Sequence, residues 1–154
     1  MADDGGTRPD PSASVDAAAA RRGAGLRVLL ADDNKVNQHI IGRMLERLGC
    51  RVETVDNGAD AVAAVRRGAY DVVFMDLQMP GLDGIGATAA IRALPNPERR
   101  QVWIVALTAD AYAEDGHRCR AAGMNDFVAK PVRRADLDAC LARLPPSGPT
   151  RAGN

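Results

Sequence analysis

The chain has 154 residues, a length that suits one domain at the usual ~100 to 200 residues per domain. Its 20 basic and 20 acidic residues cancel, so no overall field attracts nucleic acid or an anionic membrane. The apolar runs are far shorter than the ~20 residues that cross a bilayer, and the acidic N-terminus lacks the apolar segment of a secretory signal, so we expect a cytoplasmic protein with no nucleic-acid or membrane partner.

Both ends of the chain have the composition of disordered segments. Residues 1–24 are rich in Gly, Ala, Asp and Arg and nearly free of large apolar side chains, and residues 145–154 are rich in Pro and Gly. Such segments cannot bury enough apolar surface to offset the entropy that is lost on ordering. We therefore expect two disordered tails, 1–24 and 145–154, around one folded unit of residues 25–144.

Short apolar runs alternate five times with amphipathic stretches in the folded unit, which predicts strands alternating with helices. In chain order we predict strand 27–31, helix 36–48, strand 51–54, helix 59–65, strand 72–75, helix 87–94, strand 103–107, helix 113–122, strand 127–129 and helix 134–144. The first helix takes its apolar repeat from Val36, Ile40, Ile41, Met44, Leu45 and Leu48. Gly49, Gly68 and Gly123 are placed to end the helices before them. This order predicts an α/β fold, a doubly wound five-stranded parallel sheet with helices on both faces.

The cysteines and histidines indicate neither disulfides nor a soft-metal site. Cys50, Cys119 and Cys140 are odd in number, widely spaced and form no CxxC pair. This pattern favours free thiols that pack as small apolar side chains in a reducing compartment. His39 and His117 lack a second His or Cys at ligand spacing, so we predict that both lie on helix surfaces.

Four of the predicted strands are followed by a charged or hydroxyl side chain. Asp32 and Asp33 follow the first strand, Asp76 the third, Thr108 the fourth and Lys130 the fifth. Because open α/β sheets bind ligands beyond the carboxyl ends of their strands, we expect these side chains to lie close together. Three carboxylates, a hydroxyl and an ammonium suit a divalent cation and a phosphoryl group.

Asp32 and Asp33 fit two roles, helix capping and metal binding. Asp and Asn are preferred N-cap residues, but one cap is enough and Asn34 can supply it. Two adjacent acids after a buried strand repel each other unless a cation is bound. Mg²⁺ prefers a few carboxylates together with waters and phosphate oxygens, so we predict a Mg²⁺ site at this position.

Asp76 follows the most apolar of the predicted strands. Asp often begins a turn, but here the turn comes later, at residues 79–82. The Asp76 carboxylate can coordinate the same ion as Asp33, and it can attack a phosphoryl group to form an aspartyl phosphate. A bound metal would screen the repulsion between this carboxylate and the incoming phosphate.

Thr108 and Lys130 are candidates for binding the phosphoryl oxygens. Thr108 also fits as an ordinary strand residue, and a lone Lys is usually solvated. At a phosphate site, the hydroxyl would donate to one oxygen and the ammonium would pair with others. Pro131 can hold a cis bond that directs Lys130 inward.

Together, and in this order, these residues resemble the receiver domain of two-component response regulators. The resemblance covers residues 25–144 and includes the segments LLADDN, VVFMDLQMPGLDG, ALTA and AAGMNDFVAKP. It implies a flavodoxin-like (β/α)5 fold with strand order 2-1-3-4-5. It also implies a phosphoacceptor signalling domain, not an enzyme, whose own chemistry is limited to gaining and losing a phosphoryl group.

The resemblance assigns a role to each residue of the predicted site. Asp76 would be the phosphorylated aspartate, and Thr108 and Lys130 would bind the phosphoryl oxygens. The implied ligands of Mg²⁺ are Asp32, Asp33, Asp76 and the main-chain carbonyl of Gln78.

Three further positions take a role from the same resemblance. Phe127 matches the aromatic switch residue of the family, although the sequence alone makes it ordinary core. Phosphorylation would draw Thr108 toward the phosphate and let Phe127 rotate inward, which would alter the face built from the fourth helix, fifth strand and fifth helix. Gln78 and Asp110, each two residues beyond Asp76 and Thr108, would tune dephosphorylation.

In their amino-acid sequence, the motifs most resemble those of receivers in hybrid sensor kinases. Such receivers commonly exchange phosphate with a histidine phosphotransfer protein. We therefore expect a histidine kinase or a phosphotransfer protein as donor. A downstream protein would read the signal, because residues 145–154 cannot form a DNA-binding domain.

Gly86 departs from the family, which often has an acid there, and with Gly84 it should loosen the start of the third helix. A single-domain regulator and a receiver excised from a hybrid kinase both fit the sequence.

Other functions fit only parts of the pattern. A Mg²⁺-dependent phosphohydrolase with an aspartyl intermediate would need a second acid two residues after Asp76, where Gln78 stands, and a cap over its substrate. An interaction domain that no longer accepts phosphate would have lost part of the five-residue site, which is intact. A flavin-binding domain of similar sheet order would need a phosphate-binding loop where Asp32 and Asp33 lie.

Overall fold

The computed structural model describes residues 25–109 and 113–145. The predicted disordered tails, 1–24 and 145–154, therefore lie outside the described residues except for Pro145, and Asp110 also lies outside them. The described ranges cover the predicted folded unit apart from residues 110–112.

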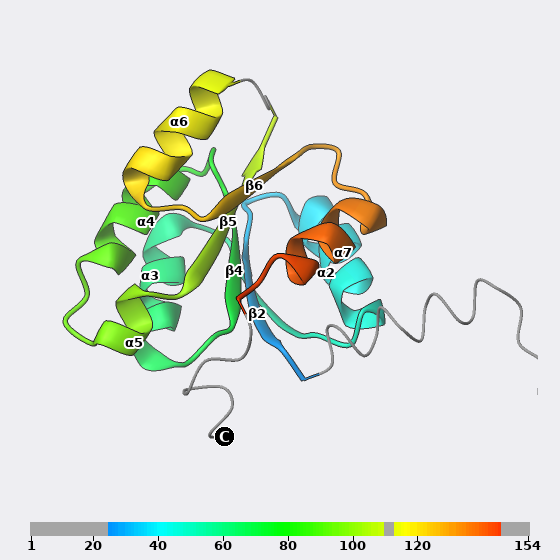
Figure 1. The fold of residues 1–154 in the computed structure, drawn as a ribbon, viewed down its shortest axis with the longest axis horizontal. Coiled ribbons are helices and arrows are strands. Elements are labelled where there is room, and N and C mark those ends of the chain that lie inside the picture. The colour runs from blue at the N-terminus through cyan, green and yellow to red at the C-terminus, as the bar shows by residue number, and fades with distance from the viewer. Residues whose placement is uncertain (1–24, 110–112, 146–154) are drawn as a thin grey trace, which may run out of the picture.

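Five parallel strands form a single sheet in the centre of the domain (Figure 1). The strands are β2 (Arg27–Ala31), β3 (Arg51–Val55), β4 (Val72–Asp76), β5 (Trp103–Thr108) and β6 (Asp126–Ala129). They lie in the order β3-β2-β4-β5-β6, and every neighbouring pair is parallel. This arrangement confirms the predicted strand order 2-1-3-4-5. The chain runs from β2 to the edge strand β3 and then crosses back to β4, on the other side of β2.

The helices cover both faces of the sheet. Their bounds are α2 (Lys35–Arg47), α3 (Gly58–Arg67), α4 (Gly84–Arg92), α5 (Pro97–Arg100), α6 (Ala113–Ala122) and α7 (Arg134–Ala142). Helices α2 and α7 pack on one face, and α3, α4 and α6 pack on the other (Figure 1). The doubly wound α/β fold expected from the sequence is thereby confirmed.

The central strands are apolar on both sides because each side faces a different layer of helices. In β2, Val28 and Leu30 belong to the core beneath α2 and α7, whereas Leu29 and Ala31 belong to the core beneath α3 and α4. All five residues of β4 are buried. This alternation explains why the strands appear in the sequence as short continuous apolar runs.

The element boundaries differ from the predictions at several places. Strands β3, β4, β5 and β6 are each one residue longer than predicted. Helix α4 starts at Gly84, three residues earlier than predicted, because the Asp83 carboxylate accepts a hydrogen bond from the Gly86 amide at 2.8 Å and caps the helix. The expected loosening of this helix start by Gly84 and Gly86 concerns its stability and stays a prediction. The short helix α5 was not predicted, and it begins at Pro97, a residue that favours the first turn.

The buried stripe of α2 also differs from the predicted one. Val36 and Ile40 are 66% and 46% exposed, so they do not belong to the core. Gln38 is instead buried, in line with Ile41 and Leu45. The prediction from the apolar repeat was therefore wrong about which side of this helix faces the core.

The predictions that both histidines lie on helix surfaces, that the cysteines are free and that glycines follow the helices before them are confirmed, whereas α3 and α7 end at Arg67 and Ala142 and not at the predicted residues 65 and 144. His39 and His117 are exposed on α2 and α6. Cys50, Cys119 and Cys140 are free and buried. Gly49 and Gly123 both have positive φ after their helices, which favours glycine.

Two helix glycines should respond in opposite ways to substitution by Ala. A Cβ at Gly58 would lie 2.1 Å from the carbonyl oxygen of Leu82, whereas a Cβ at Gly42 meets nothing within 4 Å. We expect Gly58→Ala to lower the free energy of unfolding by about 1–3 kcal/mol, the usual cost of overpacking. Gly42→Ala should raise it by about 0.5–1 kcal/mol through helix propensity.

Urea unfolding followed by circular dichroism measures both changes against the unsubstituted chain. Equal stability of Gly58→Ala and the unsubstituted chain would show that the loop around Leu82 yields without cost.

Candidate functional site

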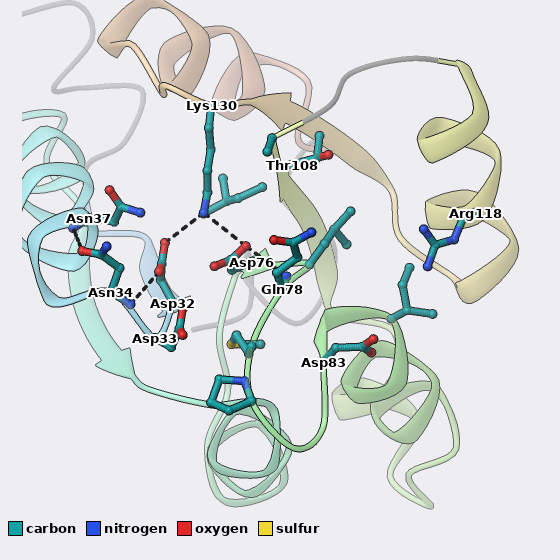
Figure 2. A pocket seen from close by; sticks show the side chains of 16 residues that line it. Asp32, Asp33, Asn34, Asn37, Asp76, Gln78, Asp83, Thr108, Arg118 and Lys130 are labelled. Carbon is teal, nitrogen blue, oxygen red and sulfur yellow. Dashed lines mark hydrogen bonds and ion pairs between the residues drawn. The ribbon is translucent and has the colours of Figure 1, made fainter.

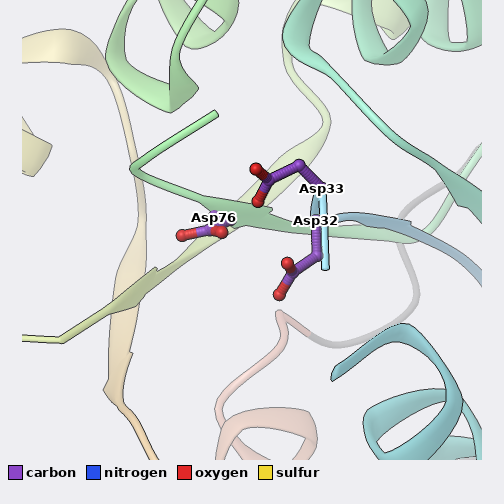
Figure 3. A group of neighbouring side chains, drawn as sticks. All are labelled: Asp32, Asp33 and Asp76. Carbon is purple, nitrogen blue, oxygen red and sulfur yellow. The ribbon is translucent and has the colours of Figure 1, made fainter. Parts of the chain in front are cut away.

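Three carboxylates meet at the carboxyl edge of the sheet. Asp32 and Asp33 follow β2, and Asp76 ends the adjacent strand β4. Each offers one oxygen, and these oxygens all lie within 4.8 Å of one another (Figure 3). Asp32 and Asp76 are 0% and 4% exposed, while Asp33 is open to solvent. The predicted convergence of the three acids is present.

The cap of α2 is Asn34, so neither aspartate is needed for this role. The Asn34 side chain accepts a hydrogen bond from the Asn37 amide at 3.1 Å. The Asn34 amide in turn donates to Oδ1 of Asp32 at 2.9 Å, which fixes that carboxylate. Capping therefore does not account for the two adjacent acids, whereas a bound cation would.

Lys130 reaches into the site from the end of β6 (Figure 2). Its Nζ lies 3.2 Å from Oδ1 of Asp76 and 3.6 Å from Oδ2 of Asp32. The peptide bond from Lys130 to Pro131 is cis, the form that the sequence allowed at this proline. One ammonium thus lies between two buried carboxylates and offsets part of their repulsion.

The electrostatic environment disfavours the charged form of Asp76. Burial raises the pKa of this carboxyl above its usual range, and the nearby Asp32 charge adds to the rise. The Gln78 amide, which donates to Oδ1 of Asp76 at 3.2 Å, and the Lys130 ammonium lower the pKa but do not cancel the rise. A further positive charge at this position would therefore stabilise the carboxylate.

The donor set fits a hard divalent cation. Oδ2 of Asp32 is buried and has no hydrogen-bond partner, because its contact with Lys130 at 3.6 Å is too long for one. A buried carboxylate oxygen without a donor is costly unless something else binds it. Together with Asp33 and Asp76 it forms an all-oxygen group of the kind that Mg²⁺ prefers.

The acids line a cleft of about 870 Å³ that also contains the other predicted phosphate-binding residues. Thr108 ends β5 and is buried at the wall of the cleft, and Lys130 and Gln78 line it as well (Figure 2). The Lys130 amide donates to the Thr108 carbonyl at 2.7 Å, so the ends of β5 and β6 are held together. The cleft brings a hydroxyl, an ammonium and the acids to one place.

Sequence reasoning missed residues on the rim of the cleft. Asn37 on α2, Asp83 before α4 and Arg118 on α6 all line it. Asn37 and Arg118 lie on helices, and the rotation of a helix about its own axis cannot be read from the sequence to within one residue. The sequence held one sign of this part of the site. Gln38, the residue after Asn37, is a polar residue on the buried apolar side of α2.

Phe127 lies on β6 at the back of the site. It is partly buried and packs against the core beneath α3, α4 and α6, where its ring lies 3.6 Å from the position of a Cβ at Gly116. This is compatible with both ordinary core packing and the predicted switch, so the switch stays a prediction. The predicted tuning role of Asp110 concerns a residue outside the described part of the chain.

The family model for the response regulator receiver domain matches residues 28–142. The chain belongs to this family. The match includes every residue that lines the cleft, and it confirms the resemblance that the motifs indicated.

Relatives and solved structures of the receiver family agree with this placement. The sensor protein GacS of Pseudomonas syringae pv. syringae is 45% identical over 113 residues, which cover 72% of this chain and 12% of that protein. The receiver domain of sensor histidine kinase PA1611 of Pseudomonas aeruginosa, solved with magnesium coordinated in its active-site cleft, is 47% identical with a TM-score of 0.72. The likeness covers 79% of this chain and 98% of that one.

A third relative was solved with its partner. The receiver domain of the Saccharomyces cerevisiae response regulator Ssk1, in complex with the histidine phosphotransfer protein Ypd1, is 31% identical with a TM-score of 0.71, and the likeness covers 79% of this chain and 89% of that one. The match to this chain covers only 6 to 16% of the length of the curated histidine kinases and sensor proteins that it resembles. Within residues 25–109 and 113–145, no helix has the length and apolar character that crossing a bilayer requires.

The raised pKa of Asp76 predicts that Asp76→Asn stabilises the metal-free receiver domain at neutral pH. A carboxyl whose pKa is higher in the folded state costs stability when it is ionised, and this cost disappears as the pH falls below its unfolded value of ~3.9. We expect a gain of about 1 kcal/mol in the free energy of unfolding at pH 7, the usual size of a single-site effect.

Thermal unfolding in a chelator, from neutral pH down to pH 4, measures this difference. The gain should shrink once the pH falls through the raised pKa of Asp76 in the folded state, and most of it should be lost near the unfolded value. A variant that is less stable than the unsubstituted chain at pH 7 would mean that the ion pair with Lys130 outweighs burial.

Proposed function

We propose that this receiver domain is a phosphoacceptor switch in a phosphorelay, in which Asp76 accepts a phosphoryl group from the phosphohistidine of a histidine kinase or phosphotransfer protein. The observation that carries the proposal is the setting of Asp76. Its carboxylate ends a buried strand, lies with two other acids in one open cleft, and has an ammonium 3.2 Å away. The similarity to receivers that bind magnesium or a phosphotransfer protein supports it.

The Asp76 carboxylate acts as the nucleophile. One of its oxygens forms a bond to phosphorus while the bond from phosphorus to the donor imidazole nitrogen breaks, and the electron pair stays on that nitrogen. Lys130 neutralises negative charge on the phosphoryl oxygens, and the Thr108 hydroxyl donates to one of them. The product is an aspartyl phosphate that stores the signal on the domain.

Magnesium would be held by Asp32, Asp33, Asp76 and the main-chain carbonyl of Gln78. When bound, it supplies charge that screens the repulsion between the Asp76 carboxylate and the incoming phosphate. Asp33, which is open to solvent, is the carboxylate that an entering ion meets first.

The switch uses strands β5 and β6 and the helices beside them. Thr108 pairs with Ala129 in the sheet, next to Lys130, and Ala106 pairs with Phe127. A movement of Thr108 toward the phosphate therefore acts directly on the strand that carries Phe127, and through it on the face of α6, β6 and α7. A downstream protein partner reads that face, as the family resemblance implies.

We assign the domain no turnover of external substrates. Its own chemistry is the gain and loss of one phosphoryl group, tuned by Gln78 and Asp110, and a phosphohydrolase would need an acid at position 78. We place its action in the cytoplasm, where phosphohistidine donors are made and where free thiols such as its buried cysteines stay reduced. Its partners are proteins, with no nucleic-acid or membrane partner.

Acetyl phosphate with Mg²⁺ should add one phosphoryl group to the full chain, and Asp76→Asn should abolish the addition because the nucleophile is gone. Intact-mass spectrometry measures the adduct. Asp60→Asn, the same change at an exposed acid on α3, is the matched control and should label like the unsubstituted chain. An adduct that persists in Asp76→Asn would contradict the assignment.

Lys130→Ala should slow phosphorylation by about 100-fold, the usual cost of removing one stabilising charge. The other lysine of the chain, Lys35, is exposed and paired with Asp56, so Lys35→Ala is the matched control. Rates are measured with radiolabelled phosphate from a phosphorylated histidine phosphotransfer protein. Equal slowing in both variants would show that the effect is one of net charge and not of position.

A further inference from the structure

Gln38 is a buried polar residue that has no role in the proposed phosphoryl transfer. Among the described residues, 25–109 and 113–145, the buried polar side chains are those of Asp32, Gln38, Asp76, Thr88 and Thr108. Three of these belong to the cleft, while Gln38 lies on α2 behind it, 8% exposed. Burial of a side-chain amide is costly unless its hydrogen bonds are made, so its partners indicate its role.

The amide nitrogen of Gln38 is surrounded by oxygen acceptors. It donates to the main-chain carbonyl of Asp32 at 2.6 Å and to Oδ1 of Asp56 at 2.7 Å, and the Val55 carbonyl lies at 3.4 Å. All three partners accept, so only the donor end of the amide fits here. The side chain links the ends of β2 and β3 to the first turn of α2.

The bond to Asp32 acts on the peptide that joins the first two acids of the site. The carbonyl of Asp32 belongs to the planar peptide unit that continues to Asp33, so holding this oxygen also fixes the direction of the chain at Asp33. The same segment is held on its other side, where the Asp32 amide donates to the Val55 carbonyl at 3.1 Å. The main-chain amide of Gln38 donates to the Asn34 carbonyl at 3.0 Å, which anchors the side chain to the segment that it holds.

Asp33 depends on this support more than the other two acids do. Asp32 and Asp76 are buried in packed strand ends, and Asp32 also accepts from the Asn34 amide. Asp33 is exposed, and its carboxylate is directed toward the other two by the course of the main chain. A change in the peptide after Asp32 would therefore alter the spacing of the three oxygens.

We infer that Gln38 is a positioning residue for the metal site, which holds the peptide between Asp32 and Asp33 so that both carboxylates face one cation. The inference rests on the proposed Mg²⁺-dependent function and adds a residue to it. Gln38 does not line the cleft, so it would contact neither the ion nor the phosphoryl group. Removing a group of this kind typically weakens metal binding by about 10- to 100-fold.

Gln38→Met tests the inference, because it keeps the length of the side chain and removes the donor. Mg²⁺ binding to the full chain is measured by isothermal titration calorimetry, and we expect the Kd to rise at least about tenfold. Gln101→Met, the same change at an exposed residue after α5, is the matched control and should bind as the unsubstituted chain does. An unchanged Kd in Gln38→Met overturns the inference.

The dependence of phosphorylation on Mg²⁺ separates positioning from general damage. With acetyl phosphate as donor, the Mg²⁺ concentration at half-maximal rate should rise by the same factor as the Kd, and the rate at saturating Mg²⁺ should return to within about twofold of the unsubstituted rate, since every reacting group remains. A lower maximal rate with unchanged half-saturation overturns the inference.

Folding and the proposed function are checked in the same experiments. If Gln38→Met does not fold by circular dichroism, Gln38→Leu, which also removes the donor without adding a charge, decides in its place, and loss of the fold in both overturns the inference, because Gln38 would then support the domain as a whole. Failure of the unsubstituted chain to bind Mg²⁺ or to take up phosphate would instead contradict the proposed function, and is seen before any variant is compared.

Discussion

The repulsion between carboxylates at one sheet edge is the constraint on which the rest of the site depends. The parallel register pairs Ala31 with Met75, so Asp32 and Asp76, the residues that follow this pair, are brought side by side whether or not they are charged. Lys130 offsets one charge, and with Asp33 included two negative charges remain when all three acids are ionised. One divalent cation would neutralise this excess, so the geometry of the sheet itself fits the binding of such an ion.

The same backbone connections that gather the site also link it to the outer face of the domain. Lys130 and Thr108 are joined through a main-chain hydrogen bond between β5 and β6, and Phe127 lies on β6 against the core beneath α6. A change in charge at Asp76 therefore acts first on groups whose strands border that face. Packed layers with few voids transmit a displacement instead of absorbing it, which supports the proposed route from a phosphorylated site to a partner.

Close approach of main chain to main chain shapes the cleft. The carbonyl of Asp76 lies 2.3 Å from the position that a Cβ at Gly84 would take, and the Leu82 carbonyl lies 2.1 Å from that of a Cβ at Gly58. Glycines at the starts of α4 and α3 thus allow the segment after β4 to pack closely behind Asp76. Their low helix propensity predicts a weak helix start, but the Asp83 cap and the packing outweigh it, which is why the boundary of α4 was predicted too late.

The sequence by itself determined the order of strands and helices, the parallel sheet, and the residues that end its strands, because these depend on local periodicity and on the rule that parallel strands share one carboxyl edge. It also indicated the chemistry of Asp32, Asp33, Asp76, Thr108 and Lys130, since acids, a hydroxyl and an ammonium gathered at one such edge suit a cation and a phosphoryl group. Only the tertiary structure decided which face each helix turns inward. That choice exposes Val36, buries Gln38 against the end of β2, and places Arg118 on the rim of the cleft. A rotation of one residue about a helix axis changes such contacts completely, and it is set by packing against residues far away in the sequence.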